Sequence, residues 1–180
     1  MVPDKLLLWK CKQGSRTAFR QTYEKYESDL RTLAANLLDD KTAAEDVVHD
    51  VFVSFLKVVD TFELRSSLAG YLKTCVANKC RDYVRKRLQE AAAMSNSEPA
   101  MSDDNWPVHL VIENEQMQRL CSAISQLPYE DREAVVLRLH GHMTFRTIGK
   151  LQNASTKTAY LRYRSGLDRL KRMLSGERER

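Results

Sequence analysis

The sequence lacks the features of a membrane protein and of a disulfide-stabilised secreted protein. No apolar run approaches the roughly 20 residues that cross a bilayer, and the segment from Leu6 to Trp9 is too short for the core of a signal peptide. The 4 cysteines have no paired CxxC spacing, which argues against a structural zinc site. We therefore expect a cytoplasmic chain without membrane insertion, in which reduced thiols are buried in the core.

Glycine is also scarce, with 6 residues in 180, while apolar residues recur at a helical spacing along most of the chain. Across Ser15–Leu37 they return every three or four positions, which predicts one face of a long helix. Thr42, with Glu45 three residues later, has the pattern of a capping box and predicts the start of a second helix. A third helix is expected at about 68–88. The predicted fold class is all-α.

Between Leu88 and Gln118 the chain contains no lysine or arginine, whereas basic residues cluster on both sides. The stretch is acidic, polar and interrupted by proline, so we predict a flexible linker at 89–114 between two small helical domains, 1–88 and 115–180. Each basic cluster is a footprint for a polyanion. The first cluster, expected on the outer face of the third helix, is Lys73, Lys79, Arg81, Arg85, Lys86 and Arg87; the second includes Arg146, Lys150, Lys157, Arg162, Arg164, Arg169, Lys171 and Arg172.

The last part of the chain has the pattern of a helix-turn-helix. Thr144 can cap a short helix, a turn follows at 152–155, and Ser155 can cap a longer basic helix. The second helix of this motif fits the DNA major groove and presents its N-terminal residues to base edges, while Ser155 and the neighbouring backbone N–H groups suit a phosphate. The residues predicted to face nucleic acid are Thr156, Lys157, Tyr160, Leu161 and Arg164 on this helix, and Lys79, Arg85 and Lys86 on the third helix.

Four blocks of residues occur in order along nearly the whole chain. They are Ala44–Phe52; Tyr71-Leu72 with Ala77-Asn78 and Asp82 before Arg85–Arg87; Leu127-Pro128; and Thr144–Ile148 with Ser155, Thr158 and Arg162. Together they resemble a bacterial sigma factor of the extracytoplasmic-function group. The resemblance implies that the first domain binds and melts the promoter minus-ten element, and that the helix-turn-helix reads the minus-thirty-five element. The linker would thread toward the active cleft of RNA polymerase.

The same resemblance assigns roles to single residues. Asp46, His49 and Asp50 occupy the helix face that family members offer to the coiled coil of the polymerase beta-prime subunit, and an acidic face suits a basic partner helix. Asn78 stands at the position of the family's base-capturing asparagine, and the loop 62–67 is similar to the one that holds a flipped base. The resemblance adds Arg162 to the DNA-binding candidates. It leaves open whether a separate anti-sigma factor holds the two domains.

Three residues depart from the family pattern. Tyr71 stands where tryptophan is usual, Gln152 where an apolar residue is usual, and Asn153 where glycine is common. Tyrosine can still stack, and asparagine tolerates the left-handed backbone conformation. The packing beneath Gln152 is therefore the feature expected to differ.

Two other functions compete with the promoter-specificity subunit that we predict from these observations. One is a stand-alone helix-turn-helix regulator that binds a palindromic duplex without polymerase. The other is a helical metal-dependent enzyme using Glu45, Asp46, His49 and Asp50, but a bridged carboxylate site needs a second such cluster, and none is visible in the sequence. We therefore predict a protein without catalytic activity, cofactor or metal, whose partners are core RNA polymerase and promoter DNA.

Overall fold

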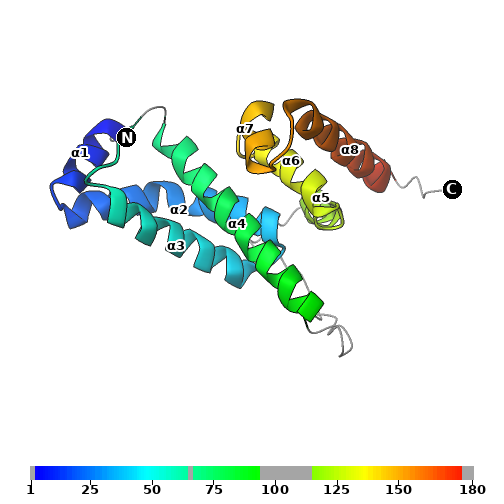
Figure 1. Ribbon diagram of the computed structural model, residues 1–180, viewed down its shortest axis with the longest axis horizontal. Helices are drawn as coiled ribbons and strands as arrows, with labels where there is room; N and C mark the ends of the chain where they lie inside the picture. Colours follow the sequence, from blue (N-terminus) through cyan, green and yellow to red (C-terminus); the bar gives the residue numbers. More distant parts are fainter. Residues whose placement is uncertain (1–2, 65–66, 94–114, 176–180) are drawn as a thin grey trace.

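The computed structural model describes residues 3–64, 67–93 and 115–175, and within these ranges every regular element is a helix (Figure 1). This confirms the all-α prediction. Most of the predicted linker, at 94–114, and two residues of the loop 62–67 lie outside the described residues. The helices are α1 (Asp4–Lys12), α2 (Arg16–Leu38), α3 (Lys41–Val58), α4 (Leu68–Ala93), α5 (Glu115–Ser125), α6 (Tyr129–Leu139), α7 (Phe145–Leu151) and α8 (Thr156–Ser175).

The junction of α2 and α3 is set by two consecutive aspartates. Asp39 ends α2 in the left-handed conformation, with φ of 59°. Asp40 then caps α3, because its carboxylate accepts the backbone N–H of Ala43 at 2.9 Å. The capping box predicted at Thr42 is therefore wrong: the sequence signal was close, but the cap lies two residues earlier.

The core of the N-terminal half lies between α2, α3 and α4. Leu33, Leu37, Phe52, Leu72 and Val76 are fully buried there, as their helical spacing predicts. The sequence analysis did not predict α1, which packs on α2. Its Asp4 carboxylate accepts the Tyr26 hydroxyl at 2.6 Å.

The predicted thiols are only partly buried. All 4 cysteines are free, but Cys75 and Cys121 are half-buried while Cys11 and Cys80 lie in the interior. Burial raises the pKa of the Cys80 thiol, with the nearby Glu133 acting in the same direction. Cys80 is therefore an inert core residue at neutral pH.

In the C-terminal half, α8 packs closely on α6 and α7. The contact with α6 depends on Gly166, where an added Cβ would lie 2.6 Å from Val135 Cγ2. Thr144 and Ser155 cap α7 and α8 by accepting the N–H groups of Thr147 and Thr158, which confirms both predicted caps. Asn153 occupies the left-handed region in the turn between them, with φ of 48°.

The two halves share one hydrophobic core rather than standing apart. Helix α6 packs against α2, and its buried residues Ala134, Val136 and Leu137 belong to the same cluster as the core of α2, α3 and α4. Helix α4 also runs five residues beyond its predicted end, to Ala93 (Figure 1). The division at 1–88 and 115–180 stays a prediction.

Candidate nucleic-acid interface

The first turns of α8 present an exposed, basic surface. Thr156, Lys157, Tyr160, Leu161 and Arg164 are all exposed, and no aspartate or glutamate occurs between residues 156 and 167. The Tyr160 ring packs edge-on against Phe145 of α7, with centroids 5.4 Å apart. Its hydroxyl accepts a hydrogen bond from Arg164 at 3.2 Å. This geometry holds two of the predicted DNA-facing side chains in fixed positions at the helix surface.

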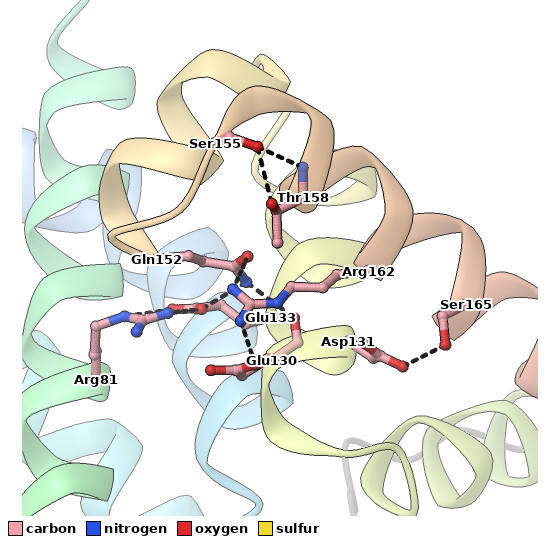
Figure 2. Close-up of polar contacts among 9 residues, drawn as sticks. All are labelled: Arg81, Glu130, Asp131, Glu133, Gln152, Ser155, Thr158, Arg162 and Ser165. Carbon is pink, nitrogen blue, oxygen red and sulfur yellow. Dashed lines mark hydrogen bonds and ion pairs between the residues drawn. The ribbon is translucent and has the colours of Figure 1, made fainter.

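Ser155 is oriented at the start of this surface. Its hydroxyl accepts the Thr158 backbone N–H at 3.0 Å and lies 2.9 Å from the Thr158 hydroxyl (Figure 2). The side chain is exposed, so it lies at the N-terminal end of α8, where backbone N–H groups favour an anion.

Arg162 is placed differently from the other α8 candidates. Its guanidinium forms an ion pair with Glu130 at 2.5 Å and donates to the Gln152 side-chain oxygen at 3.0 Å (Figure 2). Only 22% of the side chain is exposed. In this arrangement Arg162 joins α8 to the turn before it and to α6.

Gln152 is buried, and its partners explain why a polar residue stands at this position. Its amide donates to the Glu133 carboxylate and to the Glu130 backbone carbonyl, both at 2.9 Å. The expectation that the packing beneath Gln152 departs from an apolar pattern is therefore met by a hydrogen-bonded carboxylate.

Glu133 is the functional candidate that the sequence analysis missed. Its side chain is 0% exposed, and burial raises its pKa, while Arg81 and the Gln152 amide oppose that effect. One sequence signal could have revealed it: Glu133 precedes the buried Val136 and Leu137 by three and four residues, so it lies on the apolar side of α6.

Two cations of the first basic cluster face the C-terminal helices instead of solvent. The Arg81 guanidinium contacts both oxygens of Glu133, with its Nε donating at 3.2 Å. Lys73 forms an ion pair with Asp29 at 2.9 Å, donates to the His140 carbonyl, and is only 10% exposed. The predicted outward orientation of the whole cluster is therefore wrong for these two residues, because α6 covers that side of α4.

The rest of the α4 cluster lies on the surface. Asn78 is exposed, and Arg85 pairs with Asp82 at 3.0 Å. Lys79 and Lys86 form longer contacts, 3.5 Å to Asp50 and 3.7 Å to Glu90. Surface pairs of this kind contribute about 0–1 kcal/mol, so a phosphate can compete for these cations.

The acidic surface predicted on α3 is present. Asp46, His49 and Asp50 are exposed, and their spacing places them on one face of the helix. Among the described residues, no three His, Cys, Asp or Glu side chains are grouped so as to hold a metal ion. No described helix is both long and apolar enough to span a membrane.

The described part of the loop 62–67 packs against aromatic neighbours. The Phe62 ring lies 4.5 Å from that of Tyr71 and 5.7 Å from that of Phe55, measured between centroids. Burial raises the pKa of Tyr71 to about 12, and its contact with Cys75 adds to this effect. The aromatic cluster fixes the loop to the start of α4, on the same helix that carries Asn78.

Comparison with known proteins places these features in a wider group. Residues 22–89 match the family described as Sigma-70 region 2. The RNA polymerase sigma factor CarQ of Myxococcus xanthus is 27% identical over 176 residues, covering 93% of this chain and 95% of CarQ. The ECF RNA polymerase sigma factor SigX of Bacillus subtilis is 23% identical over 167 residues, covering 89% of this chain and 86% of SigX.

A solved structure shares the fold. The sigma factor RpoE from Bartonella quintana, determined in complex with the anti-sigma factor NepR, superimposes with a TM-score of 0.66 at 23% identity. The similarity covers 89% of this chain and 98% of that chain. The arrangement of both helical halves is thus similar to that of a known protein.

Proposed function

The chain belongs to the extracytoplasmic-function (ECF) group of the sigma-70 family, and we propose that it is a promoter-specificity subunit of bacterial RNA polymerase. In this role it binds the core enzyme, recognises promoter DNA and starts transcription in the cytoplasm, without catalytic activity of its own. The observation that carries the proposal is the exposed basic surface on the capped helix α8, which follows the turn of a helix-turn-helix.

We assign the reading of duplex DNA to α8. Lys157, Tyr160 and Arg164 lie on its exposed first turns, and Ser155 lies at its N-terminal end. Side chains at this end of a recognition helix reach base edges, while the N-terminus itself binds phosphate. The segment 115–180 is therefore the proposed minus-thirty-five domain.

We assign the minus-ten element to the segment 1–88. Asn78 is exposed on α4 with Arg85 one face-turn away, and the loop 62–67 is anchored to the start of the same helix. A side-chain amide offers both donors and an acceptor to an unpaired base. Extruding a base costs a few kcal/mol, which such contacts offset.

Two protein partners follow from the same proposal. The exposed carboxylates of Asp46 and Asp50 suit a basic helix of the polymerase beta-prime subunit. An anti-sigma factor is the second proposed partner, because the similar RpoE chain was solved with one.

Binding to core polymerase tests the proposal most directly. We expect the Asp46→Lys, Asp50→Lys double variant to keep its helical circular dichroism but to bind core polymerase on the order of a hundredfold more weakly, because like charges opposed at an interface cost several kcal/mol. Glu24→Lys with Asp60→Lys changes the charge equally at other exposed acids and is the control. Unchanged co-purification of the first variant with polymerase would contradict the assignment.

Run-off transcription on a promoter library distinguishes the alternative function. A sigma factor gives specific transcripts only together with the core enzyme. A stand-alone regulator would instead select a palindromic duplex by itself. Selection of such a site by the purified chain, with no transcript in the presence of core polymerase, would reject the proposed function.

A further inference from the structure

The contact between α6 and the N-terminal half is unusually polar for a shared core. Tyr129, at the start of α6, lies between two guanidinium groups: Arg81 Cζ is 6.0 Å and Arg132 Cζ 5.9 Å from its ring centroid. Beside this stack, the Arg81 guanidinium binds the fully buried carboxylate of Glu133 through both oxygens. Residues from two halves of the chain, 52 positions apart, thus form one charged cluster.

Some polar groups in this cluster are incompletely satisfied. The Tyr129 hydroxyl and the Arg132 Nε are buried, and neither has a hydrogen-bond partner among the described residues. The Arg132 Nη1 reaches Asp39 of α2 only at 3.8 Å. Unpaired buried polar groups cost free energy, which they regain when water reaches them. A cluster of this composition therefore favours separation of the two halves more than an apolar contact would.

A second polar contact lies at the other end of α6. His140 Nε2 is 3.0 Å from the Asp29 carboxylate, and Lys73 binds both Asp29 and the His140 carbonyl. The interface between the halves is thus held at two points by side chains of α2 and α4. Both points cover cations of the basic cluster on α4.

Arg81 belongs to the nucleic-acid face of α4 by its position in the helix. It lies three residues after Asn78 and four before Arg85, and residues at these spacings are neighbours on one helix surface. A carboxylate that binds a guanidinium through both oxygens has the geometry of a phosphate in the same place. Glu133 and a DNA phosphate therefore compete for one cation.

We propose that Glu133 mimics a phosphate and holds the free chain in a closed, autoinhibited arrangement from which Arg81 is released to bind the DNA backbone. The inference rests on the proposed function, because it assumes that α4 contacts DNA. Opening replaces the Arg81–Glu133 pair by a pair between Arg81 and phosphate. Glu133 keeps its hydrogen bond to Gln152 in the open state, and through it the link to Arg162 on α8.

The first test measures the size of the free chain. We expect Glu133→Gln to raise the radius of gyration in small-angle X-ray scattering, since the amide keeps the size of the side chain but loses the charge that binds Arg81. Arg81→Gln should raise it as well. Glu24→Gln removes the same charge from an exposed site and should leave the radius at the wild-type value.

The second test measures binding of a fluorescein-labelled, mixed-sequence single-stranded DNA by anisotropy. Glu133→Gln should bind about three- to tenfold more tightly, because a closed population lowers the apparent affinity in proportion. Adding Arg81→Gln should abolish this gain, since the released guanidinium is what binds phosphate. A gain that survives Arg81→Gln would reflect net charge alone and would overturn the proposal.

The outcomes separate this inference from the proposed function. A wild-type radius and DNA affinity in Glu133→Gln would overturn the latch, even if the chain supports promoter-dependent transcription. An increased radius without any binding to core polymerase would instead contradict the proposed function and leave the closed arrangement standing. If Glu133→Gln fails to fold, the radius of Arg81→Gln decides: expansion supports the latch, and an unchanged radius rejects it.

Discussion

On α8 the cations Lys157 and Arg164 lie exposed on the first turns, whereas on α4 Lys73 and Arg81 are covered by helices from the other half of the chain. The two basic clusters look alike in the sequence, and both helices keep one face in the core. The difference is that α8 binds its own domain on one side only, while α4 is covered on a second side by α6. A basic cluster thus becomes a free binding surface only where tertiary packing leaves it uncovered.

The largest effect is expected where α4 is exposed, at Asn78. Asn78→Ala removes two donors and an acceptor that can bind a flipped base, so the unstacking cost of a few kcal/mol is less fully offset. We expect strongly impaired opening of duplex promoters, measured by permanganate reactivity of thymines and by transcription.

A pre-melted template provides the control for Asn78→Ala. A mismatch bubble supplies the melting, so activity on it should be largely restored, and closed complexes should form normally. Equal activity of variant and wild type on the duplex would show that Asn78 is only a surface residue.

A second large effect is expected where α8 depends on its packing, at Gly166. Gly166→Ala would place a Cβ 2.6 Å from Val135 Cγ2 and 3.2 Å from the Asp131 carbonyl. Overpacking of this kind costs about 1–3 kcal/mol, which urea denaturation would measure as a lower midpoint.

Ala154→Gly is the matched control for Gly166→Ala, because it also exchanges alanine and glycine but lies in the turn before α8. We expect it to change the midpoint less. A Gly166→Ala chain as stable as wild type would mean that α8 can move away from α6 without cost.

The local parts of this comparison could be predicted from the sequence, and the long-range parts could not. The caps at Thr144 and Ser155 and the core faces of α2 and α3 follow from residues within a few positions of each other. The Arg81–Glu133 pair spans 52 positions and crosses the acidic segment, so no local spacing reveals it. Periodicity identified the basic face of α4 but not the helix that covers part of it.

The candidate site divides in the same way. Exposure of Asp46, His49 and Asp50 and of the first turns of α8 was predicted, because each face lies opposite its own apolar stripe. The pairing of Arg162 with Glu130 and Gln152 was not, since it depends on how the turn 152–155 packs on α6. Helix α1 was missed because its apolar residues run consecutively, Leu6-Leu7-Leu8-Trp9, instead of at helical spacing.

A moderate effect is expected on α8 from Lys157→Ala and Arg164→Ala. A lost phosphate contact should weaken binding of all sequences alike and reduce the salt slope by about one, whereas a lost base contact should reduce affinity roughly tenfold at one base pair. Anisotropy titrations of an upstream promoter duplex across a salt series separate the two. Arg172→Ala, near the end of the same helix, is the control. Wild-type affinity and slope in both variants would show that the wrong helix face was assigned.

The smallest effect concerns pH and the buried carboxylate that separates the two clusters. Burial raises the pKa of Glu133 above its usual 4.5, against the opposing effects of Arg81 and Gln152. Between the unfolded and the raised folded pKa, the native state holds a proton that the unfolded state has lost. The stability contributed by Glu133 is therefore complete below 4.5 and decreases as the pH rises through the folded pKa.

Other carboxylates titrate in the same range, so the measurement is a difference between chains. We expect the free energy of urea unfolding of wild type to fall relative to Glu133→Gln as the pH increases above 4.5, because glutamine cannot lose a proton. Arg81→Gln removes the opposing charge, so it should extend this fall to higher pH. A difference that stays constant with pH would mean that Arg81 and Gln152 fully compensate the burial. A difference that changes in the opposite direction would mean that Glu133 is stabilised as a carboxylate, and that the cluster on α4 binds its own chain as firmly as α8 binds DNA.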